Sequence, residues 1–110
     1  MDITIKTVEQ VTIVDLIGDV NANTAPTVQE KILPLVQPGS KILLDMIKVP
    51  YMSSAGLRML LSLHRQASTK DGKLVLVGLS PEIQDTMSVT GFLNFFMAYE
   101  TLESGLEALK

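Results

Sequence analysis

The sequence predicts one α/β domain with a mainly parallel sheet and an antiparallel hairpin at its N-terminal edge. Three observations favour this class. Two apolar segments with strand character, residues 2–8 and 11–18, are separated by only two residues, which is the spacing of a hairpin. Nearly continuous apolar segments at residues 41–47 and 74–79 are typical of strands covered on both faces. Segments with helical spacing of apolar residues separate the later strands, so helix and strand alternate.

Length and composition limit the class of protein further. The chain has 110 residues, 46% of them apolar, which predicts a single domain over residues 1–110 with its own core. It carries 9 basic and 12 acidic residues and no basic cluster, which argues against nucleic acid or an anionic membrane as a partner. The absence of cysteine excludes disulfides and thiolate catalysis. No signal-peptide pattern and no membrane-length apolar segment is present, so we expect a cytoplasmic protein.

The helices are predicted from their start and stop signals. Thr24 and Pro26 predict the start of the first helix, with Thr24 as its N-cap. Pro34 is expected to loosen the last turn of this helix before Pro38 and Gly39 end it. A second helix is expected to follow the serines near residue 54 and to end at about Thr69.

The C-terminal part of the chain completes the pattern. Ser80, Pro81 and Glu82 carry the signals of a third helix start. A short strand at residues 95–99 and a final helix from Thr101 follow. The predicted domain therefore has about five strands and four helices, in the order β-β-α-β-α-β-α-β-α.

Two adjacent serines, Ser53 and Ser54, lie where the strand at residues 41–47 gives way to a helix. Serine is a preferred N-cap, and the start of a helix also carries free N–H groups and partial positive charge that suit an anion such as a phosphate. Loops that leave the carboxyl ends of parallel strands share one rim of the sheet, and the serines lie in such a loop. They are therefore either a helix cap alone or a modifiable site on this rim.

Four segments of the chain carry a family pattern: Gly18–Ala25, Leu44–Asp45, Tyr51–Leu57 and Val89–Leu93. Together they resemble the STAS-domain family, and more closely the bacterial anti-sigma factor antagonists. The resemblance implies a STAS-like fold and a protein that is not an enzyme and needs no cofactor or metal. It also implies an antagonist that binds a serine-kinase anti-sigma factor, is switched off by phosphorylation of Ser54, and is restored by a metal-dependent serine phosphatase.

The resemblance and the rim together give an expected partner-binding surface. The family acceptor is the serine two residues before the motif glycine, which is Ser54 here. The family usually has aspartate directly before the acceptor, and often in the loop after the second strand, where this chain has Ser53 and Asn21. Ser53 is therefore a second candidate acceptor. The expected surface consists of Asp19, Asn21, Thr24, Tyr51, Met52, Ser53, Ser54, Ala55, Gly56 and Arg58.

Other functions are compatible with parts of the sequence. Ser53 in place of aspartate allows a non-phosphorylated STAS subunit of a transport or signalling complex. A nucleotide-binding module at the rim would lack the usual glycine-rich phosphate loop. A hydrolase would lack a base for Ser54, and His64 is the only histidine, so neither a catalytic pair nor a metal site can be assembled around it. We expect the free chain to be a monomer.

Overall fold

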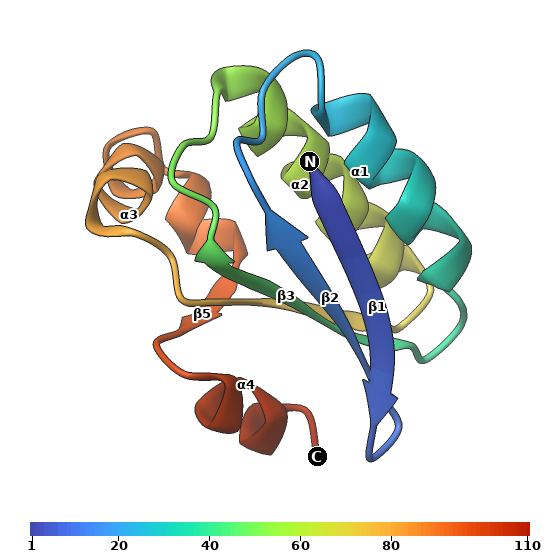
Figure 1. Ribbon diagram of the computed structural model, residues 1–110. Helices are drawn as coiled ribbons and strands as arrows, with labels where there is room; N and C mark the ends of the chain where they lie inside the picture. Colours follow the sequence, from blue (N-terminus) through green and yellow to red (C-terminus); the bar gives the residue numbers. More distant parts are fainter.

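The computed structural model describes residues 1–110 and contains one five-stranded sheet (Figure 1). The strands lie side by side in chain order, with β1 antiparallel to β2 and every other neighbouring pair parallel. This arrangement confirms the predicted mainly parallel sheet with an antiparallel edge hairpin. The strands are β1 (Asp2–Val8), β2 (Val11–Ile17), β3 (Lys41–Lys48), β4 (Lys73–Val77) and β5 (Met97–Tyr99).

Helices cover both faces of the sheet (Figure 1). Residues of α1, α2 and α3 share one large apolar cluster with the sheet, whereas α4 packs against a smaller cluster on the opposite face. The structure has the four α-helices that the sequence predicts. They are α1 (Ala25–Ile32), α2 (Ser54–Thr69), α3 (Pro81–Val89) and α4 (Leu102–Ala108), with short 3₁₀ helices at Leu33–Leu35 and Phe92–Phe95.

The position of β3 between two covered faces of the sheet explains why its sequence is almost continuously apolar. Successive side chains of a strand point to opposite faces. Ile42 and Leu44 therefore join the cluster under α1 and α2, while Leu43 joins the cluster under α4. All three are fully buried. Burial on both faces thus explains why apolar and polar residues do not alternate along most of this strand.

Two predicted strand boundaries differ from the structure, each for a local reason. The strand predicted at residues 74–79 ends at Val77, because Gly78 adopts a left-handed φ of 73°. The strand predicted at residues 95–99 begins only at Met97, because the preceding residues form a 3₁₀ helix. As expected from Pro34, the last turn of the first helix tightens into a 3₁₀ turn.

The β1–β2 hairpin is closed by the two-residue turn Glu9–Gln10. Both residues have positive φ, 49° and 70°, which is the backbone of a type I′ turn. This turn pairs Val8 with Val11 and thereby fixes the register of the hairpin down to Asp2 and Ile17.

Candidate functional site at the serine rim

The rim is assembled by backbone pairing beyond the ends of β2 and β3. Val20 and Met52 form an isolated parallel bridge. The N–H of Val20 donates to the carbonyl of Tyr51 at 2.9 Å, and the N–H of Ser53 donates to the carbonyl of Val20 at 2.9 Å. Two loops far apart in sequence are thereby joined, which confirms that the serines lie at the carboxyl rim of the sheet.

Gly56 allows the first turn of α2 to approach this junction closely. A Cβ atom at this position would lie 2.9 Å from the carbonyl oxygen of Val20 and 2.7 Å from Cγ of Met52. The first of these contacts is with backbone, so a side chain would force the helix away from the loop. The motif glycine is therefore explained by packing.

The two serines have different roles at the start of α2. Ser53 is the N-cap, and its Oγ accepts a hydrogen bond from the N–H of Gly56 at 3.3 Å. Ser54 is the first helical residue; its side chain is exposed and makes no hydrogen bond. Beside it, the N–H groups of Ser54 and Ala55 have no acceptor, as expected of the first turn of a helix. The hydroxyl of Ser54 is thus free, while that of Ser53 holds the helix end.

The loop before α1 is held by Asn21. Its Oδ1 accepts hydrogen bonds from the N–H of Asn23 at 2.9 Å and of Thr24 at 3.1 Å. Thr24 is the N-cap residue of α1 as predicted, but its side chain makes no capping bond. Its Oγ1 instead donates to the carbonyl of Asp19 at 2.8 Å and accepts from the N–H of Asn21 at 2.9 Å. The acceptor role of Asn21 needs only an oxygen at this position, which an aspartate would also supply.

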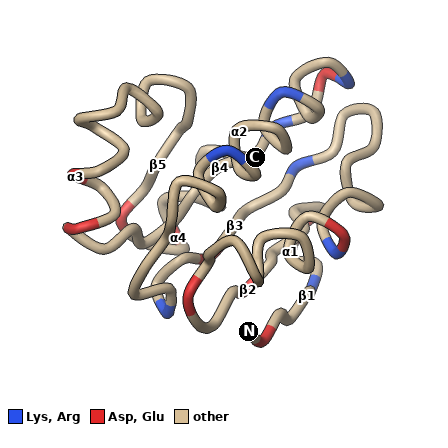
Figure 2. The backbone as a smooth tube through the Cα atoms, turned by 90° about the horizontal axis from the view of Figure 1, so that it is seen from above, with Lys and Arg blue, Asp and Glu red and all other residues tan.

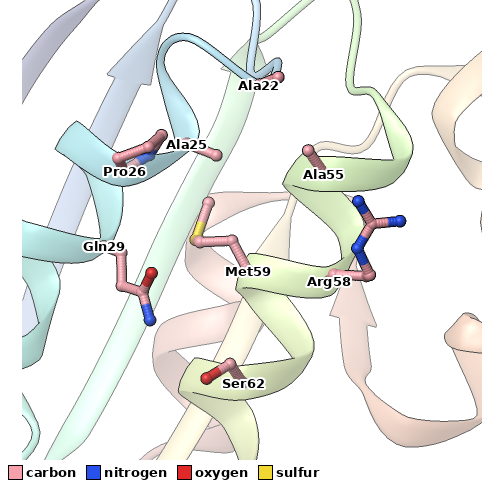
Figure 3. A pocket seen from close by; sticks show the side chains of 8 residues that line it. All are labelled: Ala22, Ala25, Pro26, Gln29, Ala55, Arg58, Met59 and Ser62. Atoms are coloured by element: carbon pink, nitrogen blue, oxygen red, sulfur yellow. The ribbon is translucent and has the colours of Figure 1, made fainter.

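A shallow hollow of about 380 Å³ lies between α1 and α2 next to the serines (Figure 3). In Figure 3, Met59 and Ala25 lie on the facing sides of the two helices, and Arg58 projects from α2 beside Ala55. Arg58 is exposed, forms no ion pair, and follows Ser54 by one helical turn. The guanidinium is therefore available to an anion at the start of α2.

The predicted partner-binding residues differ in their exposure. Four of them are exposed: Asp19, Tyr51, Ser54 and Arg58. Tyr51 is 55% exposed. Asn21, Thr24, Ser53 and Ala55 are half-buried. Met52 is only 6% exposed because its side chain packs into the core, and Gly56 is buried against Met52 and Val20.

The pairing role of Val20 was missed by the sequence reasoning. Val20 is fully buried, yet it stands in a turn-rich segment without strand periodicity. A single apolar residue between Asp19 and Asn21 was the available signal, because a buried side chain in a polar loop anchors that loop.

His64 lies on α2, packed against Phe96 with ring centroids 5.2 Å apart. Its Nδ1 is buried without a hydrogen-bond partner, and burial lowers the pKa of the imidazole below its ordinary value of 6.5. The structure has no group of three or more His, Cys, Asp or Glu residues that could hold a metal ion. His64 is therefore a packing residue of the fold.

Neither the distribution of basic residues nor the hydropathy of the helices indicates a further site. Lys and Arg are spread over several elements and do not gather into one patch (Figure 2). None of the helices is both long enough and apolar enough to cross a membrane. The site of interest is therefore the serine rim.

Comparisons with known proteins agree with this architecture. Residues 2–105 match the sequence model of the STAS domain. BtrV of Bordetella bronchiseptica, named as an anti-sigma factor antagonist, is 31% identical over 111 residues, covering 100% of this chain and 96% of the relative. A Thermotoga maritima crystal structure described as an anti-sigma factor antagonist superposes with a TM-score of 0.91 at 20% identity, covering 97% of this chain and 93% of the other. The phosphorylated form of the Bacillus cell fate determinant SpoIIAA has a TM-score of 0.74 at 17% identity, covering 99% and 100%.

Proposed function

The chain belongs to the STAS domain family, and from this premise we propose that it is an anti-sigma factor antagonist controlled by phosphorylation of Ser54. In its unphosphorylated form it binds a serine-kinase anti-sigma factor in the cytoplasm and thereby frees a sigma factor. The kinase then phosphorylates Ser54 and the complex separates. A metal-dependent serine phosphatase restores the active form. The observation that carries this proposal is the exposed, unbonded hydroxyl of Ser54 on the rim.

The structure favours Ser54 over Ser53 as the acceptor. A kinase must reach the hydroxyl oxygen, and the Oγ of Ser54 is exposed and free. The Oγ of Ser53 is engaged as the N-cap, so its modification would remove a contact that stabilises α2 by about 0.5–2 kcal/mol. Phosphorylation of Ser54 leaves this cap in place.

The fold is suited to tolerate a phosphate at Ser54. A phosphoserine adds about −1.5 to −2 charges at neutral pH. The free N–H groups of Ser54 and Ala55 and the partial positive charge of the helix end favour an anion at this point. Arg58, one turn along the same helix, supplies a cation on the same side. The modified protein should therefore remain folded.

The same charge should weaken binding of the partner. The rim offers an exposed aromatic ring, Tyr51, and a neutral hydroxyl, Ser54. A partner surface that covers both of them must desolvate whatever stands at residue 54. Burying a phosphate without a matching cation is costly, so release follows from electrostatics without unfolding.

The proposal is tested with purified serine-kinase anti-sigma factors from the source organism and Mg-ATP. Intact-mass spectrometry should record one added phosphate on the wild type and on Ser53→Ala, and none on Ser54→Ala. In binding assays Ser54→Asp should bind the anti-sigma factor about tenfold or more weakly than wild type does. The neutral control Ser54→Asn should bind the anti-sigma factor much more tightly than Ser54→Asp. Tight binding of the wild type without any phosphorylation would instead identify a non-switching STAS subunit.

A further inference from the structure

The outer edge of β1 is an unpaired strand along the side of the molecule (Figure 1). β1 is the first strand of the sheet and pairs only with β2. Most of its residues are exposed, including Ile5 at 41%. We propose that this edge binds the same edge of a second copy of the chain, antiparallel, with the two-fold axis at Thr4.

The hairpin turn determines which backbone groups are free at this edge. In a hairpin with a two-residue turn, the residues that flank the turn form a hydrogen-bonded pair, and such pairs alternate along the ladder. Val8 and Val11 flank the turn, so the even-numbered residues of β1 direct their N–H and C=O groups toward β2. Ile3, Ile5 and Thr7 direct theirs outward. Two copies can therefore pair only in registers that place odd residues opposite odd residues.

One such register is complementary in both charge and hydropathy. With the two-fold axis at Thr4, Asp2 of each copy faces Lys6 of the other, and Ile3 faces Ile5. Within one protomer neither Asp2 nor Lys6 forms an ion pair, because the only ion pair in the structure joins Lys110 and Glu107. Cross-strand opposite charges and paired β-branched residues both stabilise antiparallel ladders. Each of these pairs occurs twice in a symmetric dimer.

The neighbouring register is less favourable. A two-fold axis at Ile5 would also place odd residues opposite odd residues, but it sets Lys6 opposite Thr4 and Asp2 opposite Val8. Both charges would then face uncharged side chains, and Ile3 would face Thr7. The sequence of β1 therefore selects the axis at Thr4.

The dimer would leave both serine rims open. In antiparallel pairing the two-fold axis is perpendicular to the sheet, so the two sheets join into one and their carboxyl rims point in opposite directions. Two partners could then bind one dimer at its two ends. This proposal departs from the expectation that the free chain is a monomer. That expectation did not consider the unpaired edge of β1.

Cysteine cross-linking tests the axis directly, because the chain has no cysteine of its own. In the proposed dimer Thr4 faces Thr4 as a non-hydrogen-bonded pair, with Cα atoms about 4.5 Å apart, a separation that a disulfide can bridge. Thr4→Cys should form a covalent dimer under mild oxidation. Thr7→Cys, a matched control, should not, because its copies are about 20 Å apart along the strands. Cross-linking of Ile5→Cys in place of Thr4→Cys would overturn the register.

A charge exchange tests the pairing in solution, with sedimentation equilibrium as the measurement and circular dichroism as the check on folding. Lys6→Asp should weaken dimerisation about tenfold or more, because both attractive pairs become repulsive. Asp2→Lys should do the same, and the double variant Asp2→Lys/Lys6→Asp should restore wild-type association. A wild type that stays monomeric at millimolar concentration, or a double variant as weak as the single ones, would refute the proposal.

Discussion

Val20 and Met52 are joined by a parallel backbone bridge in which each residue lies beyond the end of its strand. The bridge extends the β2–β3 pairing into the two loops that carry the rim. It holds the start of α2 against the loop before α1, with Gly56 at the point of contact. The position of Ser54 thus depends on the packing of Gly56 against Val20 and Met52.

We predict that Gly56→Ala lowers the free energy of unfolding by about 1–3 kcal/mol, because a Cβ atom would lie 2.9 Å from the carbonyl oxygen of Val20. Urea unfolding measures the change. Ser54→Ala in the same helical turn is the control and should stay within about 0.5 kcal/mol of wild type, since that side chain is exposed and unbonded. A stable Gly56→Ala protein would contradict the close contact.

Asn21 provides a second prediction. Asn21→Ala should destabilise the fold by about 0.5–2 kcal/mol, because the N–H groups of Asn23 and Thr24 lose their acceptor. Asn21→Asp should be at least as stable as wild type, since the carboxylate keeps the acceptor and adds a charge favoured near the start of a helix. Thermal unfolding measures this order. Equal stability of Asn21→Ala and wild type would show that water replaces the side chain at no cost.

Much of this site could be predicted from residue types. The N-cap role of a serine before α2, the glycine in the next turn and the exposure of Ser54 all follow from local rules that act over a few residues. The order of elements was also predictable, because the apolar periodicity changes clearly between strands and helices.

The parts that were missed depend on contacts between distant segments. Met52 resembles an exposed loop residue in sequence, and only the bridge to Val20 turns its side chain into the core. The side chain of Thr24 was expected to cap α1 because threonine is a common N-cap, but its Oγ1 is instead bonded to the backbone of Asp19 and Asn21 in the preceding loop. Such a choice between local backbone partners depends on loop geometry that residue preferences do not contain.

Arg58 provides a third prediction, which rests on phosphorylation of Ser54. The phosphorylated protein should unfold at a higher temperature than the unmodified one, because the helix end favours an anion by about 0.3–1 kcal/mol and Arg58 adds an attraction. In Arg58→Ala the increase should be smaller. Arg65→Ala, which removes an exposed arginine farther along α2, should leave the increase unchanged. Identical increases in all three proteins would exclude a role for Arg58 in holding the phosphate.

His64 gives the fold a dependence on mildly acidic pH. Its pKa in the folded chain lies below 6.5 because the ring is desolvated by burial, while in the unfolded chain it should stay near 6.5. Below pH 6.5 the unfolded chain therefore binds more protons than the folded chain. By linkage, the free energy of unfolding is fully retained above this pH and falls as the pH drops toward the folded-state pKa.

The variant His64→Phe removes this titration while it keeps a ring against Phe96. We predict that urea midpoints measured between pH 7.5 and pH 5 fall more steeply for wild type than for His64→Phe. The carboxylates titrate in both proteins, so the difference between the two curves isolates the histidine. Parallel curves would mean that His64 is protonated equally easily in the folded and unfolded chains, and that the buried Nδ1 is reached by water.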